Sequence, residues 1–187
     1  MKAVVILGSR NPKGQTAAAV DNLVEGMTKK GIGIEKFYLP VMKFERCRQC
    51  EDNGWGICRS EGRCTIPDDF ESTVDKIRQA DVAVFATPVY YSDLSESTRT
   101  FLERLRRICM NEAGQTGIKG KIAACIAVAG GGGGGSPMCL VNMERMLGGC
   151  GFNILDVIPV RRQNADLKAT VLKITGEWIA DHIPGRQ

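Results

Sequence analysis

The chain has 187 residues, 43% of them hydrophobic, which is enough to bury one substantial core and predicts a single domain spanning residues 1–187. Its formal net charge is only +4, and the local group of Arg99, Arg104, Arg106 and Arg107 is interpreted as a solvated helix face that helps attract an anionic cofactor or partner, not as a nucleic-acid footprint. No early segment has a signal-peptide pattern and no segment has the length needed to span a membrane, so we expect a cytoplasmic protein with no nucleic-acid or membrane partner.

The first element is an apolar run over residues 3–7, which predicts a strand covered on both faces, as in a parallel sheet. The following loop, residues 8–16, carries two glycines, two hydroxyls, two amides and two cations. These groups suit a phosphate at a helix N-terminus, where backbone N–H groups are free. The order Lys13-Gly14 is wrong for an NTPase loop, and Gly8 with Gly14 does not make a dinucleotide fingerprint. The sequence therefore favours a flavodoxin-like mononucleotide loop over an ordinary strand-to-helix connection.

The next segments alternate between helix and strand. Apolar residues at helical spacing predict an amphipathic helix over residues 16–30, and an alternating pattern predicts an outer strand over residues 32–38. Residues 41–67 form a Cys-rich insert with four cysteines, three glycines and little periodicity. Asp68-Asp69 then opens a helix that continues through Ile77, because acids suit a first turn.

The second half of the chain continues the alternation. All-apolar runs over residues 82–86 and 122–129 predict two central strands, with a helix through Phe101 and Ile108 between them. Six consecutive glycines, residues 130–135, follow the second run.

Two more helices and one more strand complete the pattern. Ser136 is expected to cap a helix that Gly148 ends, with Val141, Met146 and Leu147 facing inward. A fifth strand is expected over residues 152–160. The last helix is expected to pack on the sheet through four large apolar residues, Leu167, Val171, Ile174 and Trp178.

Five strands alternating with five helices predict an α/β fold, a three-layer sandwich with a five-stranded parallel sheet. Such sheets bind ligands outside the carboxyl ends of their strands, where the strand order reverses. The unusual loops follow strands one, three and four, and they converge on one crevice if the strand order is 2-1-3-4-5.

Four sequence features together resemble the NADPH-dependent FMN reductase family, in the branch that includes the iron–sulfur flavoproteins. They are the loop over residues 8–16, the cysteine segment ending in residues 64–70, the Thr-Pro-Val-Tyr-Tyr-Ser run over residues 87–92 and the glycine run after the fourth strand. The resemblance covers nearly the whole chain and implies a flavodoxin-like fold that binds FMN and is reduced by a nicotinamide.

The resemblance also implies which residues contact FMN. Those expected to hold its phosphate are Ser9, Arg10, Lys13, Gln15 and Thr16. Those expected to line the ribityl chain and ring are Pro88, Val89, Tyr90, Tyr91 and Ser92, and those expected to lie along the isoalloxazine are Gly130, Gly131 and Gly132. The chemistry of these residues agrees, since backbone without a Cβ can approach a flavin ring closely. The alternatives are partial core packing for the tyrosines and a merely flexible loop for the glycines.

The eight cysteines fall into two groups. Cys109, Cys125, Cys139 and Cys150 are scattered and are interpreted as small buried apolar residues. Cys47, Cys50, Cys58 and Cys64 lie within eighteen residues, a density typical of metal ligands. A [4Fe–4S] cluster, a structural zinc and free or redox-active thiols all remain open, because seven residues separate the second and third cysteines where the iron–sulfur flavoproteins have two.

The function that these expectations favour is an FMN-dependent oxidoreductase that takes a hydride from NAD(P)H and passes electrons to a small acceptor such as a flavin or quinone. No protein acid or base is required, and the single histidine, His182, is expected at a helix end. The resemblance implies a homodimer or homotetramer in which a neighbour's loop, here residues 41–67, covers the flavin. The alternatives are an iron–sulfur flavoprotein or flavodoxin-type electron carrier without NAD(P)H oxidation, and a zinc-stapled interaction module without flavin.

Overall fold

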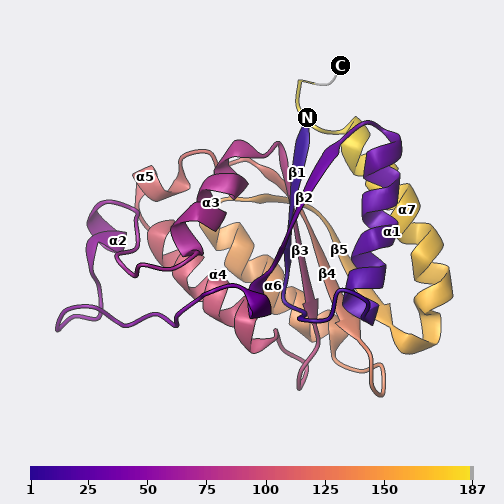
Figure 1. Cartoon of the computed structure of the whole chain (residues 1–187), viewed down its shortest axis with the longest axis horizontal. Helices are drawn as coiled ribbons and strands as arrows, with labels where there is room; N and C mark the ends of the chain where they lie inside the picture. Colours follow the sequence, from indigo (N-terminus) through magenta and orange to yellow (C-terminus); the bar gives the residue numbers. More distant parts are fainter. Residues whose placement is uncertain (186–187) are drawn as a thin grey trace.

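A computed structural model describes residues 1–185, and these form a twisted parallel sheet between two layers of helices (Figure 1). The sheet has five strands in the order β2-β1-β3-β4-β5, as predicted. The strands are β1 (Lys2–Leu7), β2 (Gly33–Tyr38), β3 (Val82–Pro88), β4 (Ile122–Ala129) and β5 (Asn153–Arg161). All four pairings are parallel, so the carboxyl ends of the strands lie along one edge.

The helices divide between the two faces of the sheet (Figure 1). One face is covered by α1 (Gln15–Lys29) and α7 (Ala165–Asp181), and the other by α3 (Phe70–Gln79), α4 (Glu96–Ile108) and α6 (Ser136–Cys150). Shorter elements are η1 (Leu39–Val41), α2 (Ile57–Ser60), α5 (Glu112–Gln115) and η2 (Arg162–Asn164). This arrangement confirms the predicted flavodoxin-like sandwich. Among residues 1–185 no helix combines the length and apolar character needed to cross a bilayer.

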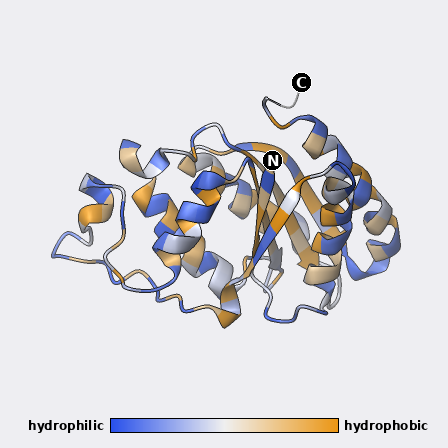
Figure 2. Ribbon diagram, turned by 45° about the horizontal axis from the view of Figure 1, so that its top comes forward, coloured by the Kyte–Doolittle hydropathy of each residue, from blue (hydrophilic) through white to orange (hydrophobic). Residues whose placement is uncertain are grey.

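The sheet separates two hydrophobic cores. In β1, Val4 and Ile6 belong to the core under α3, α4 and α6, whereas Val5 and Leu7 belong to the core under α1 and α7. Figure 2 shows the strands as largely hydrophobic ribbons and the outer helices as mixed. Burial on both faces is why β1, β3 and β4 are continuous apolar runs in the sequence.

The ends of α6 differ from the prediction. Ser136 is the first helical residue, not the cap, because Gly135 occupies the cap position with φ 83° and leaves the Ser136 side chain buried. The helix also passes Gly148 and ends after Cys150, where Gly151 adopts φ 99°. The prediction that Val141 faces inward is wrong: this side chain is 55% exposed, and Cys139, Leu140, Met143, Leu147 and Cys150 form the buried side.

The predicted inner face of α7 is also wrong for three of its four residues. Leu167, Ile174 and Trp178 are exposed, and Leu172, Gly176, Ile179 and Ala180 are buried instead. The reason is that α7 packs closely along α1. A Cβ on Gly176 would lie 2.0 Å from the carbonyl oxygen of Leu23. A small residue, not a large apolar one, therefore marks the contact face of this helix.

Candidate functional site

The loops after β1, β3 and β4 meet at the carboxyl edge of the sheet and form an open cleft of about 450 Å³. This volume is within the range of small-molecule sites, about 300–1,000 Å³. The residues that line the cleft are Ser9, Asn11, Gly14, Gln15, Thr16, Pro88, Val89, Tyr90, Val128, Gly130 and Gly131. The three loops chosen by their composition therefore lie together, as the strand order requires.

The cleft brings together most of the residues predicted to contact FMN. Those that line it are Ser9, Gln15, Thr16, Pro88, Val89, Tyr90, Gly130 and Gly131. Those that do not line it are Arg10, Lys13, Tyr91, Ser92 and Gly132, although each belongs to one of the three loops. The lining also includes Asn11, Gly14 and Val128, which were not predicted. Two of these could have been predicted as cleft residues from the sequence. Asn11 lies within the phosphate loop, and Val128 lies near the end of a buried strand.

The N-terminus of α1 opens into the cleft with its donors uncapped. Gly14 is the cap residue and supplies no side-chain acceptor, and the first turn contains no acid. Asn11 shapes the preceding loop, because its Oδ1 accepts from the Lys13 N–H at 2.9 Å and its carbonyl accepts from the Gly14 N–H at 3.1 Å. The Thr16 side chain is buried at the start of the helix. Free N–H groups, a hydroxyl and a helix dipole without a competing carboxylate fit a phosphate group.

A buried hydroxyl network fixes the loops after β1 and β3 relative to α4. Ser95 Oγ donates to the Gly8 carbonyl at 3.0 Å, and the Ser95 N–H donates to Thr87 Oγ1 at 3.0 Å. Thr98 Oγ1 lies 2.9 Å from Ser95 Oγ. Gly8 has no room for a side chain, because a Cβ there would lie 1.9 Å from Thr98 Oγ1. These hydrogen bonds to α4 therefore fix the position of the two loops at the rim of the cleft.

The loop after β3 forms a strained two-residue turn. Tyr90 and Asp93 exchange both backbone hydrogen bonds, at 3.0 and 2.9 Å, while Tyr91 and Ser92 adopt φ 48° and 63°. Side chains rarely adopt this left-handed conformation, and such strain is often found at functional sites. The turn leaves Tyr91 fully exposed and Tyr90 58% exposed beside the cleft. Core packing is therefore excluded for Tyr91, whereas Tyr90 is partly buried and lines the cleft.

Asp93 anchors this turn to two helices. It pairs with Arg99 of α4 and accepts from Asn142 Nδ2 of α6 at 3.1 Å. Partial burial raises the pKa of Asp93, but hydrogen bonds from the Leu94 N–H, Arg99 and Asn142 outweigh that effect and hold the pKa below its ordinary value. The carboxylate is therefore ionised at neutral pH and holds the turn in place.

The glycine run, residues 130–135, contacts the neighbouring structure at two points. Gln163 Nε2 donates to the Gly132 carbonyl at 3.0 Å, and a Cβ on Gly135 would lie 2.7 Å from Ser92 Cα. Gly133 and Gly135 have φ 78° and 83°, so these two positions require glycine. Gly131 has open space on its side-chain face, so its backbone can be approached closely.

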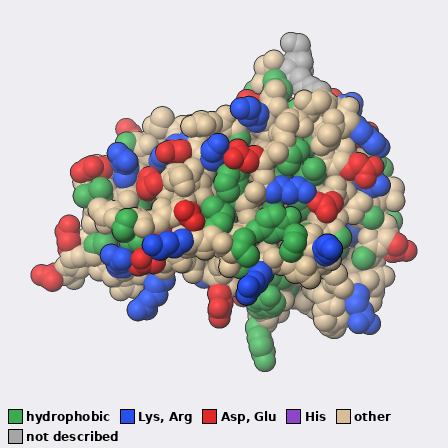
Figure 3. Space-filling model, viewed as in Figure 1, with side chains coloured by type: hydrophobic (Ala, Val, Ile, Leu, Met, Phe, Trp, Pro, Cys, Tyr) green, Lys and Arg blue, Asp and Glu red, His purple; other side chains and the backbone are tan. Residues whose placement is uncertain are grey.

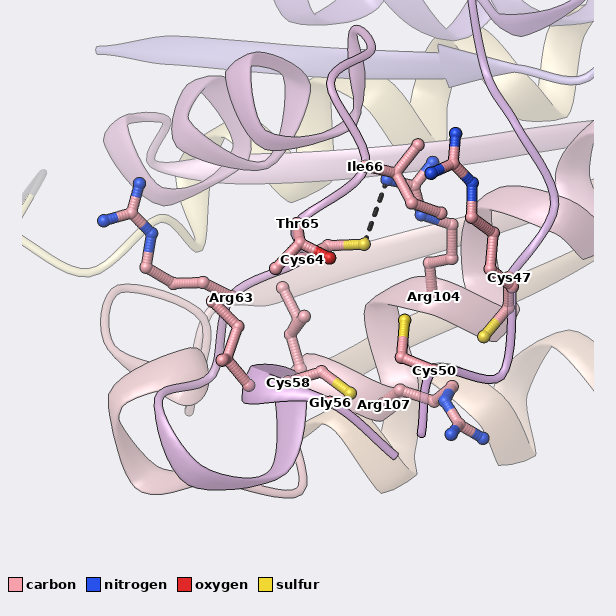
Figure 4. A pocket seen from close by; sticks show the side chains of 13 residues that line it. Cys47, Cys50, Gly56, Cys58, Arg63, Cys64, Thr65, Ile66, Arg104 and Arg107 are labelled. Carbon is pink, nitrogen blue, oxygen red and sulfur yellow. Dashed lines mark hydrogen bonds between the residues drawn. The ribbon is translucent and has the colours of Figure 1, made fainter. Parts of the chain in front are cut away.

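A second candidate site lies in the Cys-rich insert, on the far side of the molecule's α3–α4–α6 layer (Figure 1). Cys47, Cys50, Cys58 and Cys64 all line one small pocket of about 20 Å³. Figure 4 shows their four sulfurs arranged around the same space, with arginine side chains beside them. The arginines that line the pocket are Arg48, Arg63, Arg104 and Arg107. Within residues 1–185, no three His, Cys, Asp or Glu side chains are placed as ligands of a metal ion.

Arg104 holds the two ends of the insert together. Its guanidinium pairs with Asp68 at 2.6 Å, donates to the Glu45 carbonyl at 3.0 Å and to Cys64 Sγ at 3.2 Å, and lies 4.1 Å from the Phe70 ring centroid. The Arg104 and Asp68 side chains are 1% and 0% exposed. The prediction of a solvated arginine face is therefore wrong for Arg104.

The seven residues between Cys50 and Cys58 pack on α4 through one aromatic ring. The guanidinium of Arg107 lies 4.0 Å from the Trp55 ring centroid, and Arg59 lies 5.6 Å from the same ring. Arg107 also donates to the Gly54 carbonyl. Cation–π contacts of this kind fold the additional residues back against the helix.

Residues 1–158 match the NADPH-dependent FMN reductase family, most of the chain. The protein belongs to this family. An iron-sulfur flavoprotein of Archaeoglobus fulgidus is 29% identical over 128 residues, which cover 68% of this chain and 54% of the relative. The iron-sulfur flavoprotein MJ0731 of Methanocaldococcus jannaschii is 28% identical over 160 residues, which cover 86% of this chain and 75% of the relative. The chain thus spans about half the length of the first relative and three quarters of the second.

The fold is shared with a solved oxidoreductase. The NAD(P)H:quinone oxidoreductase of Methanothermobacter marburgensis superimposes with a TM-score of 0.69 at 18% identity, over 97% of this chain and 98% of the other. At this identity the likeness supports the flavodoxin-like fold alone.

Proposed function

We propose that the protein is an FMN-dependent oxidoreductase that takes a hydride from NAD(P)H and passes electrons to a small acceptor, such as a flavin or quinone. The observation that carries the proposal is the meeting of the loops after β1, β3 and β4 in one cleft, with the uncapped N-terminus of α1 at its end. FMN, when bound there, would supply the redox chemistry of the reaction, whereas the protein supplies binding and orientation.

The roles of the side chains follow from their places around the cleft. Ser9, Gln15 and Thr16, with the first N–H groups of α1, would hold the phosphate, and Arg10 and Lys13 would add positive charge to the same loop. The strained turn would present Tyr90 to one side of the flavin ring, while the backbone of Gly130 and Gly131 would approach another.

Anaerobic mixing with NADPH and with NADH tests the reductase function. We expect the flavin absorption band to bleach with at least one of them. If neither nucleotide bleaches the band while dithionite does, the protein is an electron carrier and not a reductase.

The phosphate loop can be tested separately by binding. Ser9→Ala and Thr16→Ala each remove a hydroxyl that would donate to a charged phosphate, and each should weaken FMN binding by about 10- to 100-fold, since such hydrogen bonds contribute about 1.5–3 kcal/mol. The measurement is fluorescence quenching of FMN titrated with flavin-free protein. Thr28→Ala, at the exposed far end of α1, is the matched control and should leave the affinity unchanged. Unchanged affinity in both loop variants would rule out this phosphate site.

The cysteine pocket favours a second function, the binding of a [4Fe–4S] cluster. The supporting observation is that four thiols border one space lined by four arginines, whose charge would compensate a dianionic thiolate-ligated cluster. Cys47, Cys50, Cys58 and Cys64 would be its ligands. Anaerobic reconstitution with ferrous iron and sulfide should give a broad visible absorption and about four irons per chain. Stoichiometric zinc without iron would instead indicate a structural zinc site. If the protein binds neither iron nor zinc, the four cysteines are free thiols.

We also propose that the protein self-associates, as a homodimer or homotetramer. Two large apolar side chains, Met138 and Val141, are exposed on α6, and the fully exposed Tyr91 belongs to the turn that α6 anchors through Asn142. Light scattering measures the mass directly, and a mass of about 20 kDa would contradict this proposal.

A further inference from the structure

A separate hollow of about 280 Å³ lies between the start of the Cys-rich insert and the partly exposed side of α4. It shares no lining residue with the cleft, and it shares only Cys47 and Arg107 with the cysteine pocket (Figure 4). Its volume is just below the range of about 300–1,000 Å³ for drug-sized ligands, and it therefore suits a smaller molecule. The residues that line it are Arg46, Cys47, Gln49, Arg99, Thr100, Glu103 and Arg107.

Three arginines and a single acid line this hollow, so its charge is positive. Arg46 is exposed, and neither Arg46 nor Arg107 forms an ion pair with any residue that the structure describes. Arg107 is held in place by the Trp55 ring, and Arg99 pairs with Asp93 through one of its nitrogens. Guanidinium groups with free N–H donors are well suited to bind carboxylates.

The acid of the lining, Glu103, lies midway between two of the arginines. Arg99 and Arg107 are eight residues apart on α4, which corresponds to about 12 Å along the helix axis. A hydrogen bond from Arg106, together with the charges of Arg106, Arg107 and Arg99, holds the pKa of Glu103 below its ordinary value, so this carboxylate is ionised at neutral pH. It would repel a compact anion at the centre of the hollow. A ligand with its negative groups at two ends and an uncharged middle avoids that repulsion.

Two uncharged polar side chains complete the lining. The Thr100 hydroxyl and the Gln49 side-chain amide can both donate to a carboxylate oxygen. Gln49 has φ 51°, a left-handed conformation that side chains rarely adopt and that is often found at functional sites. The insert is therefore held in an unusual conformation where it faces α4.

We propose that this hollow binds a small dicarboxylate, an extended molecule with one carboxylate at each end and uncharged carbons between them. Arg99 and Arg107 would each contact one carboxylate, Arg46 would add a third cation from the insert, and the uncharged middle would lie beside Glu103. The inference goes beyond the proposed function. It does not depend on what occupies the cleft, because the two spaces have separate linings.

Calorimetric titration of the full-length protein, as purified, tests the site with three probes at constant ionic strength. Succinate should bind saturably, at one site per chain. Succinamide, which has the same carbon chain without the charges, should not bind. Inorganic phosphate, a compact anion, should bind at least about tenfold more weakly than succinate. Equal binding of phosphate and succinate would overturn the proposal of an extended dicarboxylate.

Variants of the lining test where succinate binds. Arg46→Gln removes an exposed cation that has no carboxylate partner, and it should weaken succinate binding by about tenfold or more. Arg48→Gln is the matched control, because it removes the same charge from an exposed arginine two residues away that does not line the hollow. Its succinate affinity should stay within about twofold of wild type. Thr100→Val keeps the charge and the approximate shape, and it should weaken binding by about 2- to 10-fold through the lost hydroxyl.

The proposal is overturned if succinate shows no saturable binding up to about 10 mM, or if Arg46→Gln and Arg48→Gln bind it equally well. FMN affinity of Arg46→Gln, measured in parallel, should stay within about twofold of wild type. A parallel loss of FMN affinity would contradict a separate site. Failure of the wild type to bind FMN, with succinate binding intact, would refute the proposed function and leave this site supported.

Discussion

The buried pair of Arg104 and Asp68 is the residue-level feature that most determines the shape of the insert. Two charges at 1% and 0% exposure are tolerated because each is hydrogen-bonded to more than its partner. Asp68 accepts from the Glu45 N–H at 2.7 Å and the Phe70 N–H at 3.1 Å, while Arg104 also binds the Glu45 carbonyl. The pair therefore connects the start and the end of the cysteine segment to α4.

Removing both partners should cost less than the sum of the costs of removing each one alone. Arg104→Met or Asp68→Asn leaves a buried group unpaired and should lower the free energy of unfolding by about 3–5 kcal/mol. The double variant Arg104→Met/Asp68→Leu should lose clearly less than the sum of the single losses, because it buries no unpaired charge. Urea unfolding of all three variants measures this. Single variants with wild-type stability would contradict the structural role of the pair.

The same pair predicts a pH dependence. Burial raises the pKa of Asp68, but hydrogen bonds from Arg104 and two backbone N–H groups outweigh it, so the pKa in the folded protein lies below its ordinary value. A lowered folded pKa stabilises the protein above the unfolded pKa of about 3.9, and that stabilisation is lost as the pH falls through the folded pKa. Unfolding free energies should therefore fall below about pH 4 in the wild type and less steeply in Asp68→Asn.

At this scale the sequence was misleading where charges are buried. Arg104 stands in a local cluster with Arg99, Arg106 and Arg107, and this cluster of cations alone predicts a solvated helix face. Its partner Asp68 is 36 residues away, and nothing local in the sequence connects the two. The cleft residues were easier to predict, because composition and strand order together point to one edge of the sheet.

At the scale of elements, the close contact between α1 and α7 depends on two glycines. A Cβ on Gly26 would lie 2.0 Å from the Lys173 carbonyl oxygen, and one on Gly176 would lie 2.0 Å from the Leu23 carbonyl oxygen. Since the obstructing atoms belong to the backbone, a methyl group can be accommodated only by moving the helices apart.

Alanine substitutions should therefore have opposite effects at two kinds of helical glycine. Gly176→Ala should lower the free energy of unfolding by about 1–3 kcal/mol through overpacking. Gly148→Ala, in the interior of α6 with nothing within 4 Å, should raise it by about 0.5–1 kcal/mol, because alanine favours a helix more than glycine. Thermal unfolding of the two variants makes the comparison. Equal changes in the free energy of unfolding for the two variants would mean that α1 and α7 move apart without an energetic cost.

Strands were predicted better than helix faces for a physical reason. A central strand buried on both sides is apolar at every position, and the predicted range over residues 122–129 agrees with β4. A helix such as α7 has apolar residues on more than one side, so periodicity does not identify its inner face. Its contact is set by Gly176 and Ala180, whereas Trp178 lies at the surface, stacked on His182 at the helix end.

At the scale of the whole molecule, the structure divides the eight cysteines by location. Cys109, Cys125, Cys139 and Cys150 are buried in the core under α4 and α6, as predicted, whereas the four cysteines of the insert are partly exposed. Burial raises the pKa of Cys125 and of Cys139 to about 12, so these thiols stay protonated and unreactive near neutral pH. Figure 3 shows that positive and negative side chains are interspersed on the face viewed.

Thiol labelling tests this division. Metal-free native protein should react quickly at four thiols with Ellman's reagent and at eight after denaturation. Alkylation of the fast group should leave FMN affinity within about twofold, because the cysteine pocket and the cleft share no lining residue. A large loss of FMN affinity would show that the insert and the cleft are coupled.

The packing around Gly8 also has a consequence for how such sequences can diverge. The space that a side chain would need at this position is occupied by the hydroxyls of Thr98 and Ser95, at 1.9 and 2.5 Å from a Cβ. A homologue that acquires alanine at position 8 must therefore lose a hydroxyl from the first turn of α4 in the same lineage. A change at position 8 should therefore be accompanied by a change at position 95 or 98, nearly ninety residues away in the chain.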